Sequence, residues 1–184
     1  MKVTPLTIPE VLIVEPVKHG DDRGFFSETY NQRTWHDAGI DLVYIQDNHS
    51  LSVAIGTIRG LHFQSPPFAQ DKLVRVTRGA IWDVAVDIRL GSPTYGQWVG
   101  EEISAENWRQ ILVPKGFAHG FCTLEPDTEV QYKVTAPYSG DHDKGLKWDD
   151  PALAIDWPLS GEAQLSAKDQ HQPLLSKLPA YFHY

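Results

Sequence analysis

The stretch Ala80-Ile81-Trp82-Asp83-Val84-Ala85-Val86-Asp87-Ile88 alternates in character from one residue to the next, which is the pattern of a β-strand. Its residues 81, 83, 85 and 87 share one face, whereas residues 82, 84, 86 and 88 share the other. The first face carries the carboxylates of Asp83 and Asp87. This face is either a solvated outer surface or the wall of a polar cavity, because residues that point into a barrel need not be apolar.

Short β-like runs recur along the rest of the chain, and Gly or Pro residues interrupt the sequence between them. This regular spacing predicts an all-β sandwich or barrel of the jelly-roll type. Besides residues 80–88, the runs cover residues 11–14, 42–45, 72–76, 97–99, 110–113 and 129–135.

Helices are expected in only two places. Residues 31–38 have an N-cap in Asn31 and a stop at Gly39, and a short turn begins at Ser104. Residues 153–184 are rich in Pro and turn residues, and about 30 residues are too few to fold alone. We therefore expect a C-terminal extension that packs over the barrel, within a single domain that spans residues 1–184.

The composition excludes several classes of function. The 184 residues carry a net charge of −8, which argues against nucleic acid as a partner but still allows a local basic cluster for a small anion. The single cysteine, Cys122, rules out an intrachain disulfide and a cysteine-based zinc cluster, and we expect it to be a small buried residue. Neither a signal peptide nor a run of about 18 apolar residues is found, so a cytoplasmic protein without a membrane partner is expected.

Three residues from distant parts of the chain could form an acid–base site: His62, Tyr132 and Asp169. Proton exchange next to a carbonyl needs a base, an acid and a group that orients the base. Taken alone, each of these side chains is more readily explained by a structural or solvated role than by catalysis. His62 lies in a β-like segment, where Leu61 and Phe63 should point away from it, and where it should share its face with Gly60 and Gln64.

Two histidines, His62 and His119, also raise the possibility of a metal site. A metal-binding barrel usually offers several histidines and a carboxylate close together in sequence, and neither histidine has such neighbours. We therefore expect no metal ligands in this chain.

Several long motifs resemble the dTDP-4-dehydrorhamnose 3,5-epimerase family, and the resemblance runs from about residue 23 to residue 169. It implies a cupin-like jelly roll, a homodimer, no metal or other cofactor, and a dTDP-linked 4-keto-6-deoxy sugar as substrate. The motifs are residues 58–64, 69–76, 83–89, 114–121 and 145–151.

The resemblance also implies roles for four residues. His62 is the base, Asp169 orients it, Tyr132 is the acid on the other face of the sugar, and Lys72 stabilises the enolate oxygen at C4. This fits the chemistry, because C3 and C5 both flank the C4 ketone and each loses a proton from one face and gains one on the other. A phenol is a poor acid at neutral pH, with a pKa of about 10, and we expect nearby cations to lower the pKa of Tyr132.

Further residues match the family's ligand contacts. The resemblance implies phosphate contacts for Arg23 and Arg59, and a position near the sugar and phosphate for His119. Asp83 is expected to support Lys72 or His62. The remaining matches are Phe26 and Glu28 at the base, Gln46 and Asn48 near the nucleoside, and Tyr138 against the sugar. In this family the N-terminal strand crosses to the partner subunit, so that contacts from this part of the chain would complete the neighbour's site.

The sequence therefore predicts 3,5-epimerisation of dTDP-4-dehydro-6-deoxyglucose to dTDP-4-dehydro-L-rhamnose, on the route to dTDP-rhamnose. Double epimerisation is favoured because Arg59, His62, Lys72 and Tyr132 are all present. Three alternatives stay open: an epimerase that acts on C3 or C5 alone, a metal-dependent cupin oxygenase, and a sugar-nucleotide binding module without catalysis.

Overall fold

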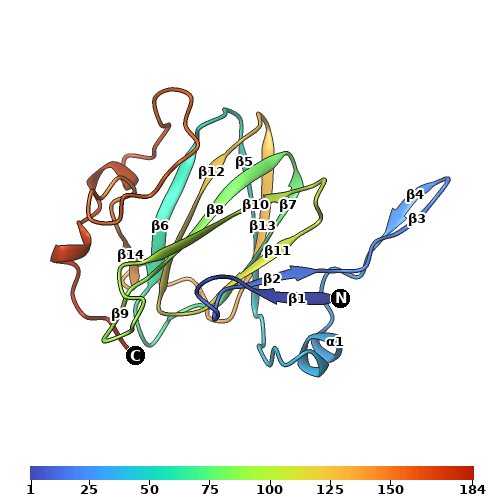
Figure 1. Cartoon of the computed structure of the whole chain (residues 1–184), viewed down its shortest axis with the longest axis horizontal. Coiled ribbons are helices and arrows are strands. Elements are labelled where there is room, and N and C mark those ends of the chain that lie inside the picture. Colours follow the sequence, from blue (N-terminus) through green and yellow to red (C-terminus); the bar gives the residue numbers. More distant parts are fainter.

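The computed structural model describes residues 1–184, and two facing β-sheets form its body (Figure 1). All strand pairs within these two sheets are antiparallel. The six-stranded sheet has the order β1 (Lys2–Pro5), β2 (Leu12–Glu15), β11 (Gln110–Val113), β7 (Lys72–Arg78), β13 (Thr128–Val134) and β5 (Gln46–Ser52). The five-stranded sheet has the order β10 (Trp98–Ser104), β8 (Ala80–Asp87), β12 (Phe117–Thr123), β6 (Ile58–Gln64) and β14 (Asp143–Gly145). The predicted all-β, cupin-like jelly roll is confirmed.

The remaining elements lie outside the two sheets. Strands β3 (His19–Asp21) and β4 (Gly24–Phe26) form a hairpin that projects from the body, whereas β1 and β2 stay paired within the chain's own sheet (Figure 1). The other elements are α1 (Gln32–Asp37), β9 (Arg89–Leu90), β15 (Phe182–His183), and the 3-10 helices η1 (Asp169–His171) and η2 (Leu175–Lys177). No helix is long and apolar enough to cross a membrane.

Helix α1 confirms the helix predicted for residues 31–38. The side chain of Asn31 accepts hydrogen bonds from the backbone N–H groups of Arg33 and Thr34, which would otherwise have no partner at the start of the helix. Gly39 follows the helix with a φ of 85°, a conformation that suits glycine and ends the helical hydrogen bonding. The turn expected at Ser104 is also present, because Ser104 and Asn107 exchange side-chain and backbone hydrogen bonds.

The main hydrophobic core lies between the two sheets. It joins Val74 and Ile111 of the six-stranded sheet to Ile81, Ala85 and Phe121 of the five-stranded sheet. Strand β8 therefore turns its carboxylate-bearing face toward the interior, and the side chains of this face are buried. The solvated-surface interpretation of residues 80–88 is therefore wrong. The face points between the sheets, as the cavity interpretation requires, but it packs in the core and none of its residues lines either of the cavities described below.

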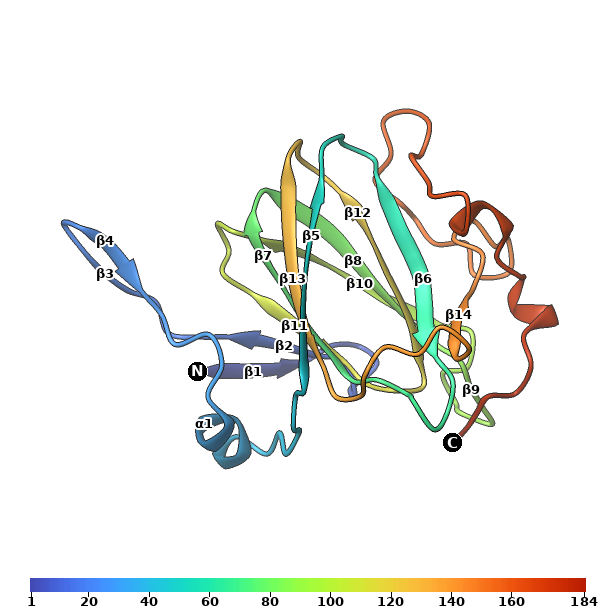
Figure 2. The same ribbon diagram turned by 180° about the vertical axis from the view of Figure 1, so that it is seen from behind.

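The outer face of the five-stranded sheet is covered by the C-terminal extension (Figure 2). Leu61 and Val84 from the sheet pack in one cluster with Leu153 and Trp157 from the extension. Burial in this layer also raises the pKa of the Cys122 thiol to about 11, as suits a small buried residue. The prediction that residues 153–184 pack over the barrel is confirmed.

Strands β5 and β12 differ from the sequence-based prediction, and the short strands β1, β3, β4, β9, β14 and β15 were not among the predicted runs either. Residues 42–45 form no strand, and β5 begins only at Gln46, because its inward positions Gln46, Asn48 and Ser50 are polar and show no apolar alternation. Strand β12 was missing from the predicted runs. All of its residues are buried, so that it has no polar face to alternate with an apolar one.

Candidate active site

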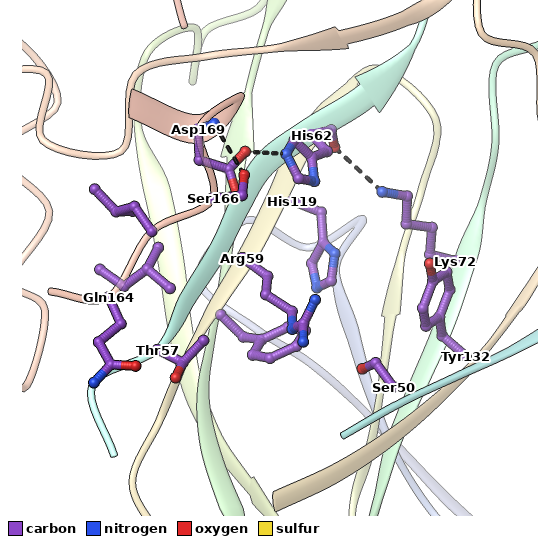
Figure 3. A pocket seen from close by; sticks show the side chains of 13 residues that line it. Ser50, Thr57, Arg59, His62, Lys72, His119, Tyr132, Gln164, Ser166 and Asp169 are labelled. Atoms are coloured by element: carbon purple, nitrogen blue, oxygen red, sulfur yellow. Dashed lines mark hydrogen bonds and ion pairs between the residues drawn. The ribbon is translucent and has the colours of Figure 1, made fainter. Parts of the chain in front are cut away.

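A cavity of about 490 Å³ opens between the two sheets (Figure 3). The five-stranded sheet contributes residues from β6 and β12, and the six-stranded sheet contributes residues from β7 and β13. The segment that leads into η1 closes a third side. The charged and titratable residues that line this cavity are Arg59, His62, Lys72, His119, Tyr132 and Asp169.

A β-bulge in β6 turns two of these side chains into the cavity. His62 lies opposite His119 and Arg59 lies opposite Phe121, so that the two residues between His62 and Arg59 oppose a single residue of β12. Strict alternation would have pointed Arg59 and His62 to opposite faces. The expectation that His62 shares its face with Gly60 is therefore wrong. The extra residue of the bulge places Arg59 on the same face of β6 as His62.

The bulge requires glycine at position 60. Gly60 has a φ of 129°, and a Cβ atom there would lie 2.6 Å from the Cα of Gly120 and 2.7 Å from the carbonyl oxygen of His119. A side chain would therefore push β6 and β12 apart at the floor of the cavity.

His62 and Asp169 form the closest polar contact in the cavity, with 2.5 Å between the imidazole Nε2 and the carboxylate Oδ1. Burial opposes ionisation of Asp169, but hydrogen bonds from His62, Ser166 and the backbone N–H of Gly60 outweigh it, and its pKa is lowered. An ionised carboxylate can only accept a hydrogen bond, so that Nε2 of His62 carries a proton. Nδ1 is then the basic nitrogen of the ring.

Lys72 lies beside this pair, and its Nζ donates a hydrogen bond to the backbone carbonyl of His62 at 3.2 Å. Burial lowers the pKa of Lys72 to about 8, against the opposing attraction of Asp83 and Asp143. The ammonium form therefore still prevails at neutral pH, in a site where a cation is poorly solvated.

Tyr132 stands on the opposite wall of the cavity, on β13 (Figure 3). Its ring packs against the core between the sheets, and burial raises the pKa of the phenol, although the charge of Arg59 acts in the other direction. The expected lowering by a nearby cation is present through Arg59, but desolvation is the larger effect, and the net pKa of Tyr132 is raised. The phenol keeps its proton at neutral pH and can donate it.

Asp83 is bonded to His119. The Nε2 of His119 lies 2.9 and 2.8 Å from the two carboxylate oxygens of Asp83, whose side chain has 0% of its surface exposed. The expected support of Lys72 by Asp83 is electrostatic, because the charge of Asp83 raises the pKa of Lys72 although its hydrogen bonds go to His119. The carboxylate of Asp83 is fully buried, and it acts on the cavity through its hydrogen bonds to His119 and through its charge near Lys72.

A second cavity of about 260 Å³ adjoins the first and shares His62, Lys72 and Tyr132 with it. Gln46 and Tyr138 lie in its wall. The amide of Gln46 is already engaged, because it accepts from the backbone N–H of Tyr138 at 3.0 Å and donates to Asn48 at 2.9 Å. The remaining polar lining residues are Gln64, Gln70, Asp143 and Lys168.

Three predicted ligand residues lie away from both cavities, on or just after the projecting hairpin. Arg23 pairs with Asp21 of the hairpin, and Phe26 is 71% exposed. The carboxylate of Glu28 accepts from Asn31 and Thr34 at the start of α1. Within one chain these three residues therefore do not join His62 and Tyr132.

Some lining residues went unnoticed in the sequence. Ser50, Thr57, Gln164 and Ser166 complete the first cavity. Only Ser166 had a recognisable pattern, since its Oγ accepts from the backbone N–H of Asp169 three residues later, as a cap does. The others are small or neutral polar residues whose types occur all over the chain.

No group of three or more His, Cys, Asp or Glu side chains is arranged to hold a metal ion. His62 and His119 face each other across adjacent strands, but each ring nitrogen Nε2 is bonded to a separate carboxylate. The site offers instead two imidazole–carboxylate pairs, an ammonium group and a phenol.

The fold and the site together define a cupin-like protein with acidic and basic side chains gathered in one cavity. The family model described as dTDP-4-dehydrorhamnose 3,5-epimerase matches residues 5–177. The chain belongs to this family of isomerases. It is 58% identical over 179 residues to the dTDP-4-dehydrorhamnose 3,5-epimerase of Sinorhizobium fredii, with 97% of this chain and 92% of that protein covered.

Solved structures agree with this assignment. The dTDP-4-dehydrorhamnose 3,5-epimerase of Bacillus anthracis, with TDP and PPi bound, has a TM-score of 0.91 and 53% identity, covering 94% of this chain and 98% of that one. The dTDP-6-deoxy-D-glucose-3,5-epimerase of Legionella pneumophila, in complex with dTDP-4-keto-L-rhamnose, has a TM-score of 0.95 and 46% identity. That match covers 100% of this chain and 98% of that one.

Proposed function

We propose that this protein converts dTDP-4-dehydro-6-deoxyglucose to dTDP-4-dehydro-L-rhamnose, in the cytoplasm and in the biosynthesis of dTDP-rhamnose. The observation that carries the proposal is the position of a base and an acid on facing walls of one cavity. His62 comes from the five-stranded sheet and Tyr132 from the six-stranded sheet (Figure 3). Inversion of a carbon needs a proton taken from one face and returned to the other, and this arrangement supplies both groups at once.

The reaction proceeds by two proton transfers at each carbon. Nδ1 of His62 takes the proton from C3 or C5, the C–H electron pair moves into the ring, and the C4 carbonyl becomes an enolate. The Tyr132 phenol then gives its proton to the opposite face of the same carbon, and the carbonyl forms again. The proton on His62 leaves to solvent and Tyr132 regains one from solvent, so that each inverted carbon acquires a solvent hydrogen.

Lys72 stabilises the developing negative charge at the C4 oxygen. A cation that is already held in a poorly solvated cavity needs no reorganisation when the enolate forms, and such groups contribute about 3 to 4 kcal/mol. Asp169 holds the tautomer of His62 and stabilises the imidazolium. No metal or other cofactor takes part in these steps.

Arg59 and His119 bind the diphosphate. Arg59 is held by Ser52, whose Oγ accepts from its Nε at 2.9 Å, and by the backbone carbonyl of Leu51. His119 is held in place by the buried carboxylate of Asp83, which lies 2.8 Å from its Nε2. Both side chains line the larger cavity, whereas Tyr138 lines the smaller one and is assigned to the sugar ring.

The protein acts as a homodimer in which the hairpin of one subunit completes the site of the other. Arg23 and Phe26 are strongly exposed on a hairpin that projects from its own chain, and a guanidinium with an aromatic ring suits a diphosphate and a nucleobase.

Complementation between two inactive variants tests whether the hairpin completes the neighbour's site. A mixture of Arg23→Ala and His62→Ala chains forms mixed dimers with one intact site, so about a quarter of wild-type activity returns. No recovery would contradict the exchange.

Two substitutions test the assignment of base and acid. His62→Ala should abolish turnover while affinity for dTDP stays close to that of the wild type. Tyr132→Phe should still exchange substrate protons with solvent but fail to complete inversion, with product formation lowered by about 10²- to 10⁴-fold. Normal turnover by Tyr132→Phe, or loss of dTDP binding by His62→Ala, would contradict the assignment. Tyr95→Phe, on a surface loop, is the matched control.

A further inference from the structure

One ion pair in the wall of the smaller cavity has no part in the mechanism above. Asp143 on β14 pairs with Lys168, the residue at the N-cap of η1. The side chains are 20% and 45% exposed, respectively, so that the carboxylate is the more enclosed partner. Both line the cavity that also contains His62, Lys72 and Tyr132.

This pair connects two segments that have no strand pairing with each other. Asp143 accepts a hydrogen bond from the hydroxyl of Tyr138 at 3.2 Å, which fixes the loop before β14. Lys168 directly precedes Asp169, the carboxylate that orients His62. A single carboxylate thus holds both the Tyr138 loop and the segment that carries Asp169 against the edge of the five-stranded sheet.

We propose that Asp143 and Lys168 are a positioning pair for the reaction, which aligns Asp169 and Tyr138 and balances the charge around Lys72. This proposal rests on the proposed function, because it assigns a role in proton transfer at the same site. An ion pair that is partly exposed contributes little to global stability, so its contribution should be found in the chemistry of the cavity.

The charges around Lys72 allow a test by opposite signs. The charged and titratable groups around Lys72 are Arg59 and His62 on β6, Asp83 on β8, His119 on β12, Tyr132 on β13, Asp143 on β14, Lys168 before η1, and Asp169 in η1. Among the charged members of this set, Asp83 and Asp143 raise the pKa of Lys72, and Lys168 lowers it. Removing the charge of Asp143 should therefore lower the pKa of Lys72, whereas removing the charge of Lys168 should raise it.

The experiment compares the pH dependence of kcat/KM in the wild type, Asp143→Asn, Lys168→Met and the double variant. The pH above which kcat/KM falls, called here the alkaline limb, should be lower in Asp143→Asn and higher in Lys168→Met, by on the order of 1 pH unit each. In the double variant it should return close to the wild-type value. Lys168→Arg keeps the charge and should keep the limb. Asp141→Asn and Lys144→Met, in the same segment, are the matched controls, because neither residue lines either cavity.

The direction of the shifts separates positioning from a purely structural role. A pair that only stabilises the fold would lower the melting temperature in every variant. The alkaline limb would then stay at the same pH, or would move in the same direction in both single variants. Either result would overturn the proposal.

A second measurement keeps the proposal testable if the wild type does not exchange substrate protons. The Lys72 signal can be followed directly by NMR in protein with ¹³C-labelled lysine, and it is assigned by its absence in Lys72→Arg. Shifts of opposite sign in the two single variants would support the pair even though the proposed function had failed. Unchanged titration would refute the pair whatever the activity of the wild type.

Discussion

Replacing Asp169 by Asn should slow proton exchange strongly while leaving the binding of dTDP nearly unchanged. The substitution keeps the size of the side chain but removes the negative charge from the partner of His62, which is 2.5 Å from Nε2 and only 3% exposed. The amide can also donate a hydrogen bond, which favours the wrong tautomer of His62 and leaves Nδ1 protonated.

The magnitude follows from the kind of hydrogen bond that is lost. A hydrogen bond to a charged group contributes about 1.5 to 3 kcal/mol, and a factor of ten in rate corresponds to about 1.4 kcal/mol. The charge alone therefore accounts for a decrease of about 10- to 150-fold in kcat, and the wrong tautomer adds to it. We expect a decrease within or above this range.

The assay is the rate of deuterium incorporation into the sugar, measured together with the affinity for dTDP and the melting temperature. Asp156→Asn, an exposed acid of the same C-terminal extension, is the control and should behave as the wild type. A loss of rate below about threefold would refute the account of the pair, because a hydrogen bond of this kind cannot contribute so little. An equal loss of dTDP affinity would assign Asp169 to binding instead.

Three other perturbations have outcomes that the structure fixes in advance. In the wild type, kcat/KM should fall above pH 8, where Lys72 loses its proton. In Lys72→Arg this fall should begin at higher pH, because a guanidinium stays charged. A fall at the same pH in both proteins would contradict this assignment. The pKa of Lys72 is lowered from 10.5 to about 8 in the folded protein, so the unfolded chain binds more protons between these values and unfolding free energy should rise with pH there. Urea titrations should show this rise in the wild type and less of it in Lys72→Met. Gly60→Ala should destabilise the fold by about 1 to 3 kcal/mol or more and lower activity with it, since φ is 129° and the new Cβ meets β12; a normal melting temperature would contradict the bulge.

The sequence predicted the fold well where one face of a strand is buried and the other is polar or packed differently. Residues 80–88 and 72–76 were assigned correctly for this reason, whereas residues 110–113 are buried at every position and were recognised only as a short apolar run. It failed at β5, whose inward residues are polar because they face the substrate cavity, and at β12, which is buried on both faces. In both strands the function or the layering of the fold removes the alternation on which the prediction depends.

The candidate site was harder to predict than the fold. Nothing in the local sequence of Asp169 connects it to His62, and only the resemblance to a family paired these two residues before the structure did so by geometry. Arg59 reaches the cavity through a bulge that strand periodicity does not reveal. The raised pKa of Tyr132 depends on burial in three dimensions, which outweighs the cation that the sequence suggested.

The partner of Asp83 was also unpredictable from spacing. His119 and Asp83 are 36 positions apart and meet only because β12 and β8 are neighbours in the sheet. The Asp143–Lys168 pair likewise depends on the C-terminal extension folding back over the barrel, where Lys168 reaches β14. Such contacts follow from how the layers stack, and sequence patterns contain little information about them.

The most direct test of the central claim is proton NMR of dTDP-4-dehydro-6-deoxyglucose with this protein in deuterated buffer, after treatment with a chelator. Base and acid on facing walls predict that deuterium enters both C3 and C5 and that dTDP-4-dehydro-L-rhamnose accumulates. Deuterium at one carbon only would contradict double epimerisation and indicate an epimerase for C3 or C5 alone. No deuterium at either carbon, with dTDP still bound, would contradict catalysis and indicate a binding module.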